Sequence, residues 1–167
     1  MRNNCVYFVE GKCEATLISA LKEYPPRILA GRIRVFNVVA NLIPRSQLIA
    51  IQANSTVVFV FDTDVPITDT LKKNIELIDR YCTRVKILYL PQVINLEDEL
   101  VRCTDIKRIA ELTGSKSSSN FKSDFCALSN CRSVLDRHKL DVAMLWTPKL
   151  PDEFTFVEHN SGQVKLP

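Results

Sequence analysis

The chain has 167 residues, of which 46% are hydrophobic and 25% charged, which excludes a disordered protein and predicts one packed domain. The formal net charge of +3 is compatible with a polyanionic partner but does not require one. No apolar run approaches the roughly 20 residues of a membrane helix, and the N-terminus lacks a signal peptide's apolar stretch, so we expect a cytoplasmic protein with no membrane partner.

The first hundred residues alternate between strand-like and helix-like segments. Residues 5–9 are apolar and β-rich, and residues 15–21 carry apolar side chains at the three- and four-residue spacings of a helix's buried stripe. By the same criteria, further strands are predicted at 32–39, 56–61 and 85–90, and further helices at 44–51 and 67–78. The predicted order is therefore βαβαβαβ.

This order determines the expected fold class. The unbroken run TVVFVF at 56–61 is typical of a strand that is buried on both faces, as in the centre of a parallel sheet. Parallel neighbours with short connections need helical crossovers, which cover both faces of the sheet. We therefore predict a three-layer, Rossmann-like α/β domain with a mostly parallel central sheet.

Beyond Pro91 the sequence predicts a helical extension. The expected elements are short helices at 94–102 and 105–112, a serine-rich loop at 114–120, and one helix over 121–138. The proline-broken tail is expected to be only partly structured and to be anchored on the core by Trp146. We divide the chain into a core at 1–103 and an extension with its tail at 104–167 that packs on the core.

Carboxylates follow the two most apolar strands at the point where each strand ends. Glu10 ends the first strand, with Glu14 four residues later on the same face of the next helix, and Asp62 and Asp64 end the third strand. Ligands of open parallel sheets bind beyond the carboxyl ends of the strands. If the first and third strands are neighbours, these acids converge on one crevice.

A cluster of carboxylates is repulsive unless a cation neutralises it. Magnesium, or manganese in its place, is the expected cation because it prefers hard oxygen ligands and keeps several waters. The alternative is that the acids only cap helix N-termini, where the helix dipole favours negative charge. The matching positions at two strand ends favour the metal site.

The segments VEGKCEATL and VFVFDTD together resemble the Toprim domain of topoisomerases and primases. In that family a Glu-Gly pair ends the first strand and an Asp-x-Asp pair ends a later one. The second glutamate, four residues after the first, resembles the Toprim nucleases of the overcoming-lysogenization-defect type and their small defence-associated relatives. The resemblance covers roughly residues 5–102, and it implies a metal site built from Glu10, Glu14, Asp62 and Asp64.

The resemblance also implies later site residues, where the match is weaker. The family carries acids on a helix after the fourth strand, and NLEDELV supplies Glu97 and Asp98 as candidates, although a solvated helix face is an equal alternative. Relatives use a lysine beyond that helix, for which Lys116 and Lys122 in GSKSSSNFKSDF are both available. These lysines, with Lys12 and Arg132, would position a phosphate backbone.

The function implied by the resemblance is metal-dependent hydrolysis of DNA or RNA phosphodiesters, in a mobile-element or phage-defence context. Defence-type relatives often work beside an ATPase. The sequence has no GxxxxGK[ST] phosphate loop, so that ATPase would be a separate chain. An oligomer is compatible with the sequence.

Two other functions stay open. The run VFVFDTDV also resembles phosphohydrolases of the haloacid dehalogenase type, with Asp62 as nucleophile and Asp64 as acid, but Glu10 then has no role. The other alternative is a Toprim-like fold kept as a non-catalytic interaction or nucleic-acid-binding module.

The cysteines suggest one further kind of site. The six cysteines form no CxxC pair and are expected to be reduced and partly buried. A zinc site built from Cys126, Cys131 and His138 is an alternative whose spacing matches no common ligand pattern.

Overall fold

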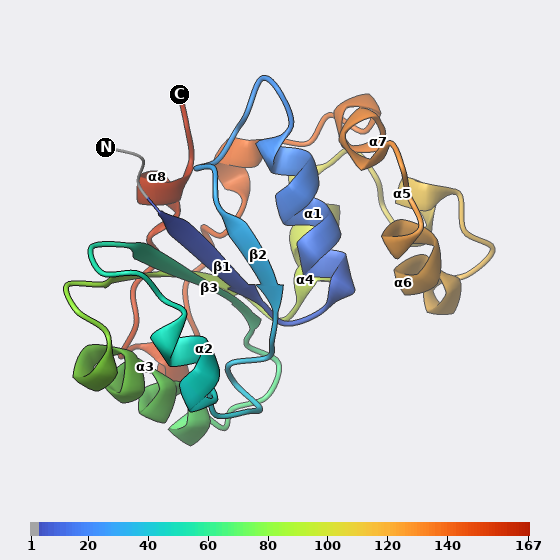
Figure 1. Ribbon diagram of the computed structural model, residues 1–167. Helices are drawn as coiled ribbons and strands as arrows, with labels where there is room; N and C mark the ends of the chain where they lie inside the picture. Colours follow the sequence, from blue (N-terminus) through green and yellow to red (C-terminus); the bar gives the residue numbers. More distant parts are fainter. Residues whose placement is uncertain (1–3) are drawn as a thin grey trace.

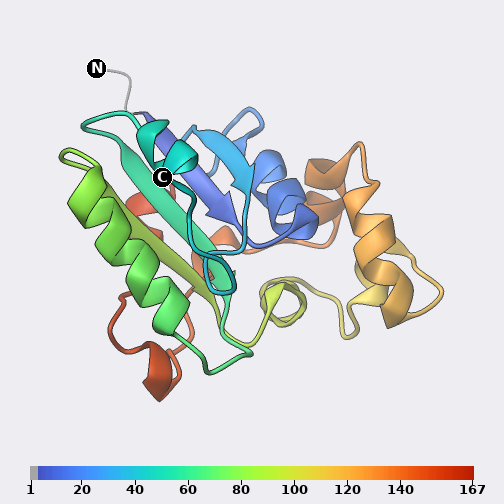
Figure 2. The same ribbon diagram turned by 60° about the horizontal axis from the view of Figure 1, so that its bottom comes forward.

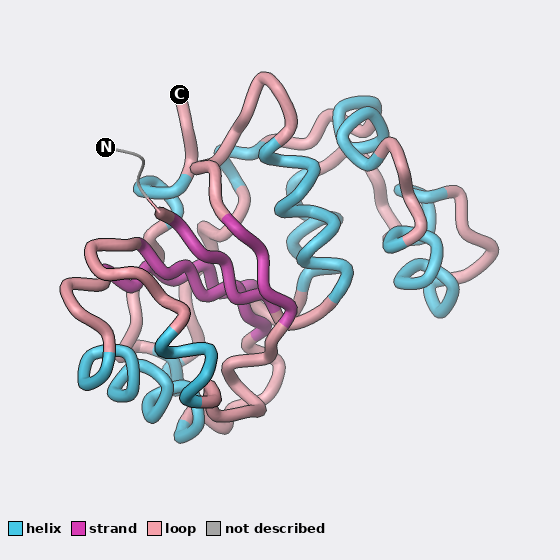
Figure 3. Tube along the Cα trace, in the orientation of Figure 1, coloured by secondary structure: helices cyan, strands magenta, loops and turns pink. Residues whose placement is uncertain are grey.

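The computed structural model describes residues 4–167 and has a four-stranded sheet at its centre (Figures 1 and 3). The strands are β1 (Cys5–Val9), β2 (Arg32–Val35), β3 (Thr56–Asp62) and β4 (Lys86–Gln92). They pair in the order β2-β1-β3-β4, and every pair is parallel. The predicted parallel sheet is confirmed, although the second strand ends at Val35, four residues earlier than expected.

Helices cover both faces of this sheet (Figure 1). On one face, α1 (Lys12–Lys22) and α4 (Leu96–Cys103) pack on Tyr7, Val9, Val58 and Val60. On the other, α2 (Arg45–Ile49) and α3 (Asp69–Tyr81) pack on alternate residues of the same strands, including Phe8 and Phe59. Because side chains alternate along a strand, both faces of β1 and β3 must be apolar, which is why these strands show no polar alternation. The fold is a three-layer, Rossmann-like α/β domain, as predicted.

The expected helix over 121–138 is wrong, because the structure contains two helices there. Helix α6 (Ser118–Cys126) is followed by α7 (Cys131–Arg137), and a short α5 (Ala110–Thr113) precedes them. Ser129 and Asn130 lie at the break, where their side chains compete with helical backbone hydrogen bonds. The break lets both helices contact α1, beyond which they lie in Figures 1 and 2.

The serine-rich segment is also shorter as a loop than predicted. Helix α6 begins at Ser118, so the last three residues of the expected loop at 114–120 are helical. In the preceding segment 105–112, only the part from Ala110 onward is helical.

The C-terminal segment is more ordered than predicted, although it has little regular structure. It contains two short 3₁₀-helices, η1 (Val142–Met144) and η2 (Asp152–Phe154), and a final turn of helix, α8 (Ser161–Val164). Trp146 is fully buried in the core, which confirms its predicted anchoring role. The Asn160 side chain accepts a hydrogen bond from the Tyr89 backbone N–H at 2.9 Å and so covers the edge of β4. No helix within residues 4–167 is long and apolar enough to cross a membrane.

One acid of the NLEDELV segment is structural. The buried Glu99 carboxylate accepts hydrogen bonds from Arg102 Nη2 at 2.6 Å and from the Trp146 backbone N–H at 2.9 Å. Glu99 therefore joins α4 to the C-terminal segment.

We expect Glu99→Gln to lower the free energy of unfolding by about 1–2 kcal/mol, because the amide oxygen in the place of Oε2 keeps both donors but loses the charge that strengthens the bond to Arg102. Urea unfolding followed by circular dichroism measures the change, and Asp98→Asn, at an exposed position on the same helix, is the control. An unchanged stability in Glu99→Gln would contradict the structural role.

Candidate functional site

The predicted convergence of the strand-end acids depends on β1 and β3 being neighbours, and they pair directly. Glu10 follows the last residue of β1, and Asp62 is the last residue of β3. The Glu10 Oε2 atom accepts a hydrogen bond from the Asp62 backbone N–H at 3.1 Å. The two motifs, 52 residues apart in sequence, therefore meet at one end of the sheet.

The glycine after Glu10 allows the second glutamate to fold back. Glu14 is buried in the first turn of α1, and its Oε2 atom accepts a hydrogen bond from the Gly11 backbone N–H at 2.8 Å. A Cβ atom at position 11 would lie 3.1 Å from that oxygen, which is tighter than ordinary packing. The spacing Glu-Gly-x-x-Glu therefore places two carboxylates beside the strand end, with the second capping the helix N-terminus.

These acids surround a small hollow of about 170 Å³. Strand alternation turns Asp62 toward the same face as Val58 and Val60, where α1 and α4 begin. Glu97, in the first turn of α4, therefore faces the acids from β1, α1 and β3. The hollow is lined by Glu10, Gly11, Lys12, Cys13, Glu14, Asp62, Glu97, Lys122 and Cys126.

The electrostatics of the hollow are unfavourable for negative charge. Burial, and then the charges of Glu10, Glu14 and the other nearby acids, raise the pKa of the Asp62 carboxyl to about 9. Burial also raises the pKa of Glu14, and the Glu10 charge adds to the effect. The Asp62 Oδ1 atom is buried and has no hydrogen-bond partner within the described chain. A bound cation would reduce the repulsion among these acids and would give the unpaired Asp62 oxygen a partner.

The structure distinguishes the two candidate lysines. Lys122 on α6 reaches the hollow, where its Nζ lies 3.2 Å from Glu97 Oε1. The hydrogen bond and charge of Glu97 raise the pKa of Lys122, and the charge of Asp62 contributes further. Lys116 is exposed in the turn before α6 and does not line the hollow. Of the two candidate lysines, Lys122 is therefore the one that lies at the hollow.

Three other predicted residues lie outside the hollow. Asp64 is exposed beyond the end of β3, close enough for its charge to act on Asp62. Asp98 is exposed, and its backbone N–H is capped by the Asn95 side chain. The Arg132 guanidinium donates to the Ala20 and Pro25 carbonyl oxygens at 3.3 and 3.2 Å. Arg132 is thus committed to the C-terminal end of α1 rather than free to hold a phosphate backbone.

Two features of the site were not anticipated from the sequence. The Thr63 hydroxyl donates to the Gln92 carbonyl oxygen and accepts from the Ile94 N–H, both at 3.1 Å, which fixes the chain between Asp62 and Asp64. Cys13 and Cys126 bring α1 and α6 together beside the hollow, with their sulfur atoms 3.0 Å apart. The position of Cys13 between Glu10 and Glu14 is the only sequence signal for this contact.

The thiols of the alternative zinc site are not gathered. Cys126 faces Cys13, Cys131 is buried in the core, and His138 Nδ1 lies 3.1 Å from Asp105 Oδ1.

The strand-end acids have the oxygen donors that a hard cation prefers. Their side chains are not arranged around a common point as the ligands of a bound metal ion are. Within residues 4–167, no three His, Cys, Asp or Glu side chains are grouped closely enough to hold a metal ion. Glu10 and Glu14 instead accept backbone N–H groups, while the Asp62 Oδ1 atom is without a partner. Carboxylate oxygens are the donors that magnesium prefers, so the donor type fits this cation although the observed arrangement does not form a ligand set.

Comparison with known proteins found no matching family model, no matching curated protein and no matching solved structure.

Proposed function

We propose that the protein is a magnesium- or manganese-dependent nuclease with a Toprim-like core. The observation that carries this proposal is the convergence of Glu10, Glu14, Asp62 and Glu97 on one hollow, where Lys122 forms an ion pair with Glu97. When all four acids are ionised, they outnumber the two lysines of the hollow, Lys12 and Lys122. The surplus negative charge at the carboxyl ends of two parallel strands supports binding of a divalent cation.

The position of each residue suggests its role in the proposed reaction. Glu10 and Asp62 would be the direct ligands of the cation. Glu14 and Glu97 would lie beside it as further acids of the hollow. The exposed Asp64 and Asp98 would add negative charge from outside the hollow. A bound magnesium ion would activate water and stabilise the leaving oxygen. Lys122 would hold the scissile phosphate, because its side chain is 70% exposed while its ammonium lies at the hollow. Lys12, also at the hollow, would add positive charge for the backbone.

The substrate would be a DNA or RNA backbone, recognised by charge rather than by base sequence. ATP hydrolysis, where the system needs it, would belong to a separate chain. We further propose a cytoplasmic location and a role in phage defence or in a mobile element, on the strength of the motif resemblance alone.

A second candidate, a non-catalytic interaction module with this fold, is favoured by one observation. Two of the four acids at the hollow are already satisfied by backbone N–H groups, as helix and strand caps would be. A phosphohydrolase of the haloacid dehalogenase type is less favoured. Its nucleophile would be Asp62, and it gives no role to Glu10, which accepts a hydrogen bond from the Asp62 backbone N–H.

Two measurements on the wild-type protein test the proposal. Millimolar magnesium or manganese should raise the melting temperature, because a ligand that binds only the folded state stabilises it. Gel assays on single- and double-stranded DNA and RNA should then show cleavage that requires the metal and stops with EDTA. A melting temperature indifferent to metal would overturn the metal site. Metal binding without cleavage of any substrate would favour the interaction module.

A further inference from the structure

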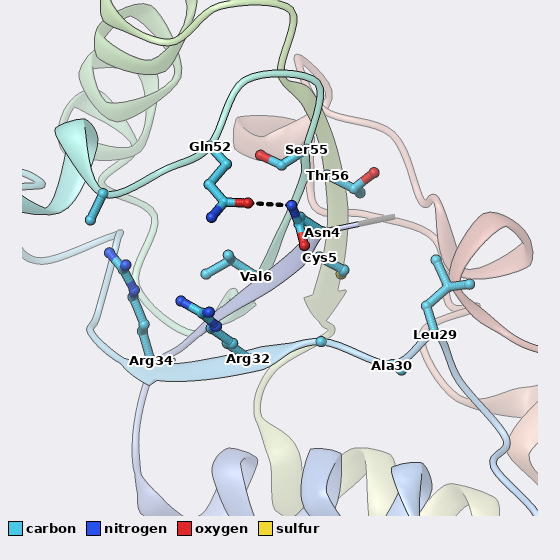
Figure 4. A pocket seen from close by; sticks show the side chains of 12 residues that line it. Asn4, Cys5, Val6, Leu29, Ala30, Arg32, Arg34, Gln52, Ser55 and Thr56 are labelled. Atoms are coloured by element: carbon cyan, nitrogen blue, oxygen red, sulfur yellow. Dashed lines mark hydrogen bonds between the residues drawn. The ribbon is translucent and has the colours of Figure 1, made fainter. Parts of the chain in front are cut away.

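A second and larger cavity lies at the opposite end of the sheet from the acids, where β1 and β3 begin (Figure 4). Its volume is about 450 Å³, within the range of small-molecule sites. The lining consists of Asn4, Cys5, Val6, Leu29, Ala30, Gly31, Arg32, Arg34, Ala50, Gln52, Ser55 and Thr56. Two of these residues are basic and none is acidic, so the cavity favours an anion.

The two arginines lie on the same face of β2. Arg32 is paired with Val6 and Arg34 with Phe8, so both side chains project on the face that carries α2 and α3. Neither guanidinium forms an ion pair with any carboxylate in residues 4–167. Two positive charges without counter-ions, two residues apart on an edge strand, repel each other and would be stabilised by a shared anion.

One arginine is held in place, and the cavity wall carries a further N–H donor. The Arg34 guanidinium lies 5.7 Å from the centre of the Phe8 ring, and its Nη1 donates to the Gln47 carbonyl oxygen at 3.2 Å. The Gln52 carbonyl oxygen is occupied by the Asn4 side chain, which leaves the Gln52 NH₂ group as a donor on the cavity wall (Figure 4). The fork of N–H groups on a guanidinium matches the oxygens of a phosphate or carboxylate.

Part of the cavity wall is apolar. The side chains of Val6, Leu29, Ala30 and Ala50 are hydrocarbon, so a bare inorganic anion would leave this part of the wall without a partner. An organic body attached to the anion would cover it and gain the burial.

We propose that this cavity binds a small phosphomonoester with a ring-bearing apolar body, of the size of a nucleoside monophosphate. The phosphate contacts Arg32 and Arg34, and the body lies against Val6 and Leu29. The site is separate from the acid hollow, since it lies at the other end of the strands and the two linings share no residue. It therefore stands whether or not the protein cuts nucleic acid.

Isothermal titration of the full-length protein in EDTA tests this site with AMP, adenosine and inorganic phosphate as probes. AMP should bind measurably, and adenosine and phosphate each at least about tenfold more weakly, because each lacks one half of the recognised group. Arg32→Gln should weaken AMP binding about tenfold, and Arg32→Gln combined with Arg34→Gln should abolish it.

Matched variants keep the result interpretable. Arg45→Gln removes the same charge from an exposed position on α2 outside the cavity and should leave AMP binding unchanged. Asp62→Asn, at the acid hollow, should also leave it unchanged. Circular dichroism confirms folding, and the exposed Arg32 can be changed alone should the double variant unfold. No binding of AMP, equal binding of adenosine, or an equal loss in Arg45→Gln would overturn the proposal.

Discussion

Replacing Asp62 by asparagine should make the metal-free protein more stable at pH 7, by about 4 kcal/mol. The folded protein holds this carboxyl at a pKa of about 9, whereas an unfolded chain holds an aspartate near 3.9. Each pH unit between the unfolded pKa and pH 7 contributes about 1.4 kcal/mol to the free energy that favours unfolding. Asparagine has the shape of the protonated acid but cannot ionise in the unfolded chain, so it avoids this loss.

The stability that depends on Asp62 should decrease as the pH rises. Because the folded pKa is raised, the contribution of Asp62 to stability is fully present below about pH 4 and is lost as the pH rises toward 9. Urea unfolding in EDTA should therefore show the wild type weakening from pH 5 to pH 9 relative to Asp62→Asn. Adding magnesium should recover stability in the wild type but not in the variant, which lacks the ligand charge.

Asp64→Asn is the matched control, because Asp64 lies two residues away but is exposed. We expect it to change the free energy of unfolding by no more than about 0.5 kcal/mol. The opposite outcome, in which Asp62→Asn destabilises the protein at pH 7, would mean that Asp62 is ionised in the folded state. The acid cluster would then be stabilising without a cation.

The fold was largely predictable because its signals are local. The apolar runs at β1 and β3 and the three- and four-residue spacing in α1 identify these elements without knowledge of the rest of the chain. The break between α6 and α7 was not predictable, because Ser129 and Asn130 are tolerated in helices unless tertiary packing favours a turn. Here the contacts of both helices with α1 decide between one helix and two.

Some residues of the candidate site could likewise be predicted from local sequence, whereas others depend on tertiary packing. Glu10, Glu14 and Asp62 could be found from sequence, since the parallel topology brings the carboxyl ends of neighbouring strands together. The choice of Glu97 over Asp98 depends on which side of one helical turn faces the strands, and the choice of Lys122 over Lys116 depends on where α6 packs. The cavity beside Arg32 and Arg34 has no sequence motif, because its walls come from chain segments that only the folded structure joins.

The last prediction separates catalysis from nucleic-acid binding. Glu10→Gln should lower metal-dependent cleavage at least about 100-fold, because an amide is a poor ligand for a hard cation while its oxygen can still accept the Asp62 N–H. Binding of DNA or RNA at low salt should be unchanged or tighter in this variant, since one negative charge facing the phosphates has been removed.

A comparison of Lys122 with Lys116 tests the role of the lysine at the hollow. Lys122→Met should lower the rate of cleavage about 100-fold, the usual loss when one group that stabilises a transition state is removed, whereas Lys116→Met should lower it by no more than a few-fold. Single-turnover cleavage at saturating enzyme measures the rate, and filter binding over a range of salt concentrations measures affinity. Equal losses of rate in the two variants would show that the lysines act only as backbone contacts, and Lys122 would lose its place at the reacting phosphate.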